Sequence, residues 1–156
     1  MAKPQRYFED LAIGEIAESS EQGVTLEEML DFARRYDPQY FHSDPEAAQE
    51  SIFGEVIASG IHTMALWRQL DATISGDIAW ICGVAWEDVR WPEPVRAGDR
   101  LRARRECLAK RISRSHADRG VVEMRYTLLN QRNQAVFTCR SINLVALRPA
   151  PASGAS

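Results

Sequence analysis

The chain has 156 residues, of which 45% are hydrophobic and 26% charged, with a formal net charge of −3 at pH 7. This composition is typical of one soluble globular domain. No run approaches the roughly 18 uninterrupted apolar residues of a membrane-spanning helix, and the first residues contain no apolar core of signal-peptide length. We therefore expect a cytoplasmic protein with no membrane partner.

The first predicted elements are a short strand and a helix. A strand is expected around positions 15–20. Thr25 and Glu28 form a capping-box pair, which predicts that a helix begins there. Its apolar residues recur every three or four positions, and it should end by Tyr36 because the next residue precedes Pro38. A second, short helix is expected at Pro45, capped by Ser43 or Asp44.

A longer apolar helix is predicted over Gly60–Ile74, because this segment is apolar nearly all round and such helices are buried. After Gly76 the apolar period changes to two, which predicts strands. Residues 78–91 are expected to form either one long bent strand or a strand pair. Further strands are expected over 100–114, 121–129 and 135–147, joined by hairpin turns. The order indicates an α+β domain over residues 1–148, with a helix packed on one face of an antiparallel sheet. Residues 149–156 are small and Pro-rich, and we expect a disordered tail.

Cysteines and charges restrict the chemistry. Cys82, Cys107 and Cys139 form no paired motif, so we expect buried free thiols rather than a disulfide framework or a zinc site. Nine basic residues, Arg105 among them, lie between positions 96 and 119. They form either a solvated strand face or a basic rim for a phosphorylated ligand. Nucleic acid is not expected, because no aromatic residues are interleaved with these bases.

Asp37 and His42 are the first candidates for catalysis. They lie five positions apart in a predicted loop, where an Asp and a His that converge can hold a water and exchange protons with it. The alternative is that Asp37 caps a turn and His42 is an exposed polar residue. The spacing alone leaves both interpretations open.

Ser59 and Gly60, where the buried helix begins, are the second candidates. The N–H of Gly60 is free of helical bonds, and a glycine allows a carbonyl oxygen to approach, as an oxyanion site requires; tight packing is the alternative. A hydrolytic triad of Ser59, His62 and Asp37 or Asp71 is disfavoured, because no Gly-x-Ser-x-Gly elbow surrounds the serine. His62 is expected to be a core histidine, and Arg68 on the buried helix needs a partner that the sequence does not identify.

Three blocks together resemble the MaoC-like dehydratase family, which includes the (R)-specific enoyl-CoA hydratases and has the hotdog fold. The first, ARRYDPQYFHSDPEA at 33–47, is similar to the family's hydratase motif. The second is GEVIASG at 54–60 and the third is WPEPVRAGDRL at 91–101. They occur in the family's order, and the likeness spans about residues 7–147.

The resemblance implies an enoyl-CoA hydratase of fatty acid metabolism with no cofactor or metal, acting as a homodimer or dimer of dimers. Asp37 and His42 would activate water, and the N–H of Gly60 would hold the thioester oxygen. Gln39, Tyr40, Ser59 and Trp67 are expected to contact the acyl-CoA substrate. The sequence departs from the family's pattern at Gln39-Tyr40 and at Ser59, where a His is usual. An acyl-CoA thioesterase and a non-catalytic acyl-CoA-binding module remain alternatives.

Overall fold

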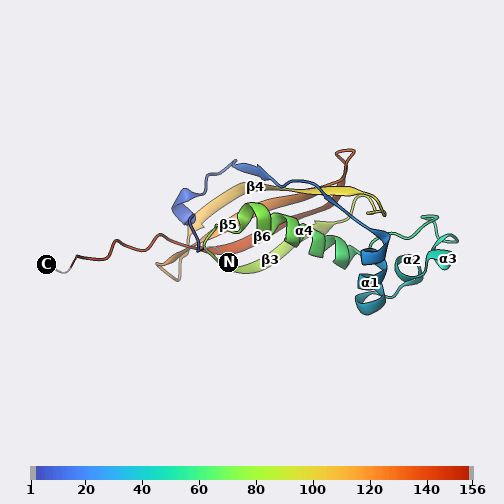
Figure 1. The fold of residues 1–156 in the computed structure, drawn as a ribbon. Helices are drawn as coiled ribbons and strands as arrows, with labels where there is room; N and C mark the ends of the chain where they lie inside the picture. Colours follow the sequence, from blue (N-terminus) through green and yellow to red (C-terminus); the bar gives the residue numbers. More distant parts are fainter. Residues whose placement is uncertain (1–2, 155–156) are drawn as a thin grey trace.

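The computed structural model describes residues 3–154 and has the expected α+β architecture, in which one long helix lies across one face of an antiparallel sheet (Figure 1). The helices and strands follow one another along the chain in this order: η1 (Phe8–Asp10), β1 (Ile16–Glu18), β2 (Gln22–Gly23), α1 (Leu26–Tyr36), α2 (Tyr40–Ser43), α3 (Pro45–Ala48), α4 (Gly60–Ser75), β3 (Trp80–Arg90), β4 (Arg100–Ile112), β5 (Arg119–Leu129) and β6 (Ala135–Ala146). Residues 149–154 form neither helix nor strand, and the last two predicted tail residues lie outside the described part.

The sheet is antiparallel throughout, in the order β1-β4-β5-β6-β3, with the short β2 also paired to β4. The segment predicted as a strand pair or one bent strand is a single strand, β3, whose pairing with β6 shifts register three times. Such irregularities bend a strand, and β3 forms an edge of the sheet.

The core lies between α4 and the inner face of the sheet. In β5, and in β4 as far as Cys107, every second residue is buried, as the period of two predicts. Trp67 of α4 is fully buried, and its ring centroid lies 4.9 Å from that of Tyr126 and 5.0 Å from that of Phe137. These aromatic contacts fix α4 against β5 and β6, so its N-terminus has a defined position.

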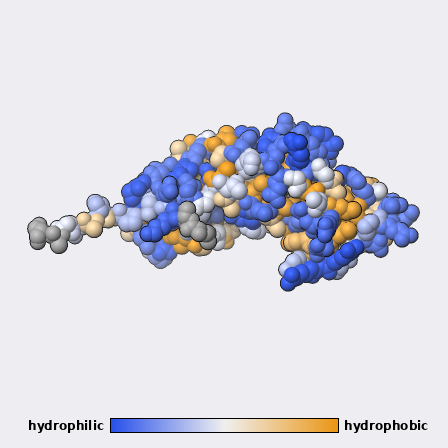
Figure 2. Space-filling model, in the orientation of Figure 1, coloured by the Kyte–Doolittle hydropathy of each residue, from blue (hydrophilic) through white to orange (hydrophobic). Residues whose placement is uncertain are grey.

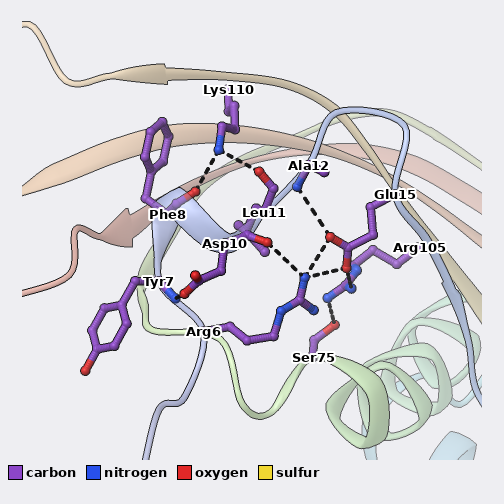
Figure 3. A network of polar contacts seen from close by, with 10 residues as sticks. All are labelled: Arg6, Tyr7, Phe8, Asp10, Leu11, Ala12, Glu15, Ser75, Arg105 and Lys110. Carbon is purple, nitrogen blue, oxygen red and sulfur yellow. Dashed lines mark hydrogen bonds and ion pairs between the residues drawn. The ribbon is translucent and has the colours of Figure 1, made fainter.

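One prediction of a buried residue is wrong, and one buried charge was not predicted. Cys82 is exposed, because it lies on edge strand β3, whereas Cys107 and Cys139 are buried as expected. Arg105 faces inward on β4 and is 1% exposed. It donates to Ser75 at the end of α4 and to Glu15, which also binds Arg6 (Figure 3). These partners compensate the buried charge of Arg105. They come from other segments of the chain, so the alternation of β4 could not indicate them.

The helical segment before α4 lies at one end of the molecule, where α1, α2 and α3 cluster near the N-terminus of α4 (Figure 1). The predicted ends of α1 are confirmed, since Thr25 and Glu28 form the capping box and Tyr36 is the last helical residue. Within the described residues, no helix is both long and apolar enough to span a membrane.

Candidate active site

Three helix ends bring the proposed catalytic residues together. Asp37 is the C-cap of α1, His42 lies on α2, and Ser59 is the N-cap of α4. We expected a loop from Asp37 to His42, but residues 40–43 form one helical turn that follows Pro38 and Gln39. This turn directs the His42 ring back towards the end of α1.

His42 is a buried histidine held in one orientation. Its Nδ1 lies 2.8 Å from the carbonyl oxygen of Ile57, and the residue is 6% exposed. Because a carbonyl can only accept, Nδ1 carries the proton in this contact and Nε2 of the neutral ring has a free lone pair. Nε2 lies 3.7 Å from Oδ2 of Asp37, too far for a direct hydrogen bond.

Asp37 is held by two donors. Ser59 Oγ donates to its Oδ2 at 2.6 Å, and Gln39 Nε2 donates to its Oδ1 at 3.1 Å. The hydrogen bond from Ser59 holds the pKa of the Asp37 carboxyl below its usual value against the opposing effect of desolvation, and the hydrogen bond from Gln39 lowers it further. Asp37 is therefore ionised near neutral pH.

Ser59 and Gly60 have separate structural roles at the start of α4. Ser59 is fully buried, and its Oγ also accepts the N–H of Ile61 at 3.3 Å. Gly60 packs against Trp91, whose Nε1 donates to the Gly60 carbonyl at 3.1 Å. A Cβ at position 60 would lie 3.0 Å from the Trp91 ring. Gly60 therefore permits close packing against Trp91, which was the alternative to an oxyanion site in the sequence analysis. The N–H of Gly60 at the helix N-terminus is still a potential hydrogen-bond donor.

A hollow of about 390 Å³ opens beside these residues. His42 and Gly60 lie at its wall, and the remaining lining is largely apolar, supplied by Phe53, Ile57, Ala58, Thr63, Trp91, Pro92, Glu93, Pro94 and Val95. Figure 2 shows hydrophobic residues gathered at the surface where the α1–α3 segment meets the body of the molecule. A concave, mostly apolar site with a few polar groups is the usual form of a small-molecule site.

The other predicted substrate contacts lie in three different environments. Gln39 contacts Asp37, as described above. Tyr40 is half exposed and packs edge-on against Phe41. Trp67 is not brought to this hollow, because it lies in the core between α4 and the sheet. No cluster of three or more potential metal ligands occurs among residues 3–154.

Sequence reasoning missed two features of the site. One is the Ile57 carbonyl that orients His42, a backbone group that no side-chain pattern can indicate. The other is Trp91, which covers Gly60. Trp91 stands directly before the Pro-Glu-Pro stretch that lines the hollow, so the third sequence block contained the signal. That block is brought close because Ala58 N–H donates to the Val95 carbonyl at 2.9 Å.

The basic stretch is extensively paired with acids on neighbouring strands. Arg100 binds Glu21, and Arg102 and Arg104 lie near Glu18. On the adjacent strand, Arg125 lies 3.5 Å from Glu106. These pairs are half exposed and fit the solvated strand face. Arg96 binds Glu55 near the edge of the hollow.

Comparison with known proteins gives a consistent result. The family model described as "MaoC like domain" matches residues 11–130. YdeM, an uncharacterized protein of Bacillus subtilis, is 30% identical over 83% of this chain and 92% of its own length. The 3-hydroxyacyl-thioester dehydratase Z of Mycobacterium tuberculosis is 37% identical over 59% of this chain, which spans 64% of that enzyme.

Solved structures agree with the sequence matches. A MaoC-like dehydratase from Rhodospirillum rubrum is 36% identical, with a TM-score of 0.84 over 92% of this chain and 99% of the other. The fold is also that of a Mycobacterium tuberculosis protein with a double hotdog fold, at 15% identity and a TM-score of 0.72. That match covers 95% of this chain and 46% of the larger protein.

Proposed function

Because the chain belongs to the MaoC-like domain family, we propose that it is a hydro-lyase that adds water reversibly across the double bond of a 2-enoyl-CoA thioester. The observation that carries the proposal is the pair of acceptors formed by ionised Asp37 and the Nε2 lone pair of His42, 3.7 Å apart. Two acceptors at this distance cannot bond each other, but they can share a donor.

A water molecule is the donor we propose. Its two hydrogens would point to Asp37 Oδ2 and His42 Nε2, which leaves the oxygen lone pair free for the β-carbon. As the C–O bond forms, one of the two residues accepts a proton from the water, and a proton is returned to the α-carbon. The residues thus end in their starting protonation states, and the geometry leaves open which one transfers the protons.

The N–H of Gly60 would stabilise the thioester oxygen as it gains enolate character. This group lies at the positive end of a 16-residue helix, where a developing negative charge is favoured. Gly60 and His42 line the same hollow, so a thioester bound there can meet both groups. The apolar lining around them would exclude bulk water from the enolate.

The active unit we propose is a homodimer that pairs along β3. This strand forms an edge of the sheet and exposes the apolar side chains of Ile81, Val84 and Trp86. An unpaired strand edge with exposed apolar residues favours association with another strand. The proposed site lies near the loop that follows β3, so a partner along this edge would lie next to it.

The test uses crotonyl-CoA and longer 2-enoyl-CoA substrates, with two readouts on each sample. Hydration removes the enoyl-thioester absorbance, whereas thioester hydrolysis releases a free thiol. We expect absorbance loss without thiol release. Thiol release would favour the thioesterase alternative, and tight binding of the thioester with neither reaction would favour the non-catalytic module; either result would refute the proposed function.

A further inference from the structure

A second pocket, of about 220 Å³, lies between α4 and the inner face of the sheet. Trp67 and Arg68 of α4 form one wall, and Gly83 and Trp86 of β3 form another. Tyr126 and Ser141, from the neighbouring strands, also line it. Whole small-molecule ligands occupy pockets of about 300–1,000 Å³, so this one suits only part of a ligand.

Its polar groups are mainly hydrogen-bond donors. Arg68 Nη1 binds Asp71 at 2.9 Å, but the Arg68 side chain is 46% exposed, and its other nitrogens have no hydrogen bond within residues 3–154. Burial raises the pKa of the Tyr126 phenol, so its hydroxyl stays protonated. The indole N–H of Trp67 is buried without an acceptor in the described chain. None of the lining residues is an Asp or a Glu.

The carboxylate that pairs with Arg68 lies behind the pocket and is not part of its lining. Asp71 is 1% exposed and accepts from both Arg68 and Ser75, and Ser75 in turn accepts from Arg105. Arg105 shares Glu15 with Arg6. Arg68 and Asp71 form one pair, and the two guanidinium groups that share Glu15 lie at the other end of this connected chain. Arg68 is the end of the chain that faces the pocket.

The pocket lies at a useful distance from the proposed reaction site. Arg68 follows Gly60 by eight residues on the same helix, which corresponds to about 12 Å along the axis. The Arg68 guanidinium is held beside Asp71, which lies one turn further from Gly60 along the helix. An acyl group of several carbons, with its carbonyl at Gly60, spans a distance of this order.

We propose that this pocket binds a carboxylate at the far end of the acyl group, so that the substrate is the 2-enoyl thioester of a dicarboxylic acid. The planar guanidinium of Arg68 matches a carboxylate, and Tyr126 can donate to the same group. This substrate class rests on the proposed function, whereas recognition of a carboxylate by Arg68 does not.

Binding is tested first, without catalysis. Three of the four tryptophans, Trp67, Trp80 and Trp86, line the pocket, so their fluorescence reports its occupancy. We expect adipate to change the fluorescence saturably and uncharged 1,6-hexanediol to leave it unchanged. Arg68→Gln should weaken adipate binding by about 10–100-fold, as the loss of a charged hydrogen bond predicts. Arg104→Gln, the same substitution in a paired strand arginine, is the matched control and should bind normally.

A second variant fills the pocket without touching the Arg68–Asp71 pair. A Cβ at Gly83 would lie 3.6 Å from Asn143 Oδ1, an ordinary contact, so Gly83→Val should fold. It should also lose adipate binding. Unchanged binding in both Arg68→Gln and Gly83→Val, or no binding to the wild type, would overturn the pocket proposal.

Catalysis then tests the substrate class. We expect kcat/KM for the trans-2-hexenedioyl thioester of CoA to exceed that for trans-2-hexenoyl-CoA by about tenfold or more, and Arg68→Gln to remove the preference. Equal values in the wild type would refute it while leaving hydration intact. If neither thioester is hydrated but adipate still binds through Arg68, the proposed function fails and the carboxylate pocket stands.

Discussion

Ser59→Ala removes the hydrogen bond that most strongly lowers the pKa of Asp37. A hydrogen bond to a charged group contributes about 1.5–3 kcal/mol, and one pKa unit corresponds to about 1.4 kcal/mol. The Asp37 side chain is 20% exposed and keeps its bond from Gln39, so solvent replaces part of the loss. We therefore expect the pKa of Asp37 to rise, by less than the full contribution of that hydrogen bond.

The assay is a carbon NMR titration of the Asp37 carboxyl in the wild type and in Ser59→Ala. The substitution also removes the N-cap of α4, at a cost of about 1 kcal/mol in the free energy of unfolding. Thr25→Ala removes the N-cap of α1 without touching Asp37, so it controls for the loss of a cap. An Asp37 pKa that is the same in Ser59→Ala as in Thr25→Ala would refute the reasoning.

The sign of the pH effect follows from the direction of the shift. Because the folded pKa of Asp37 lies below its usual value of 3.8, the ionised carboxylate stabilises the fold above about that pH. This contribution is lost as the pH falls through the folded pKa. As the pH falls through this range, the free energy of unfolding should therefore decrease less in Ser59→Ala than in Thr25→Ala.

Three further predictions concern Gly60, His62 and Arg105. Gly60→Ala should displace Trp91 and lower kcat by about tenfold or more, and the loss should be smaller in a Trp91→Leu background, where no indole meets the new methyl group. Burial lowers the pKa of His62 below 6.5, so stability should fall as the pH drops below that value, and His62→Leu should flatten the melting temperature between about pH 7 and about pH 5. Arg105→Met should cost about 3 kcal/mol or more in urea unfolding, because it unpairs a buried network, whereas Arg104→Met should cost at most about 1 kcal/mol; similar losses for the two variants would contradict the assigned roles.

The sequence predicted the fold well where local patterns decide it. The capping box at Thr25, the stop before Pro38 and the alternation of β5 depend on neighbouring residues, so they can be read from the chain. The prediction of a buried Cys82 was wrong and the burial of Arg105 was not predicted, because both environments depend on distant segments. Glu15 and Ser75 reach Arg105 only after the sheet and α4 have packed, and Cys82 is exposed because β3 is an edge.

The candidate site residues were chosen by residue type and order rather than by geometry. Asp37, His42 and Gly60 were identified from spacing and from the likeness of three sequence blocks, and the structure places them around one cluster. The partner of Arg68, which the sequence left open, is Asp71, one turn along α4. The contact of Ser59 with Asp37 and the approach of Trp91 to Gly60 join segments that are distant in the chain, so local patterns could not predict this geometry.

The most direct test of the central claim is the initial rate of crotonyl-CoA hydration by the wild type, Asp37→Asn and His42→Ala, at equal concentrations of folded protein. General acid–base groups contribute about 10²–10⁴-fold, so each variant should lose at least about 100-fold in kcat. Because both groups hold the same water, the double variant should lose little more than either single one. Hydration at the wild-type rate by either single variant would contradict the account.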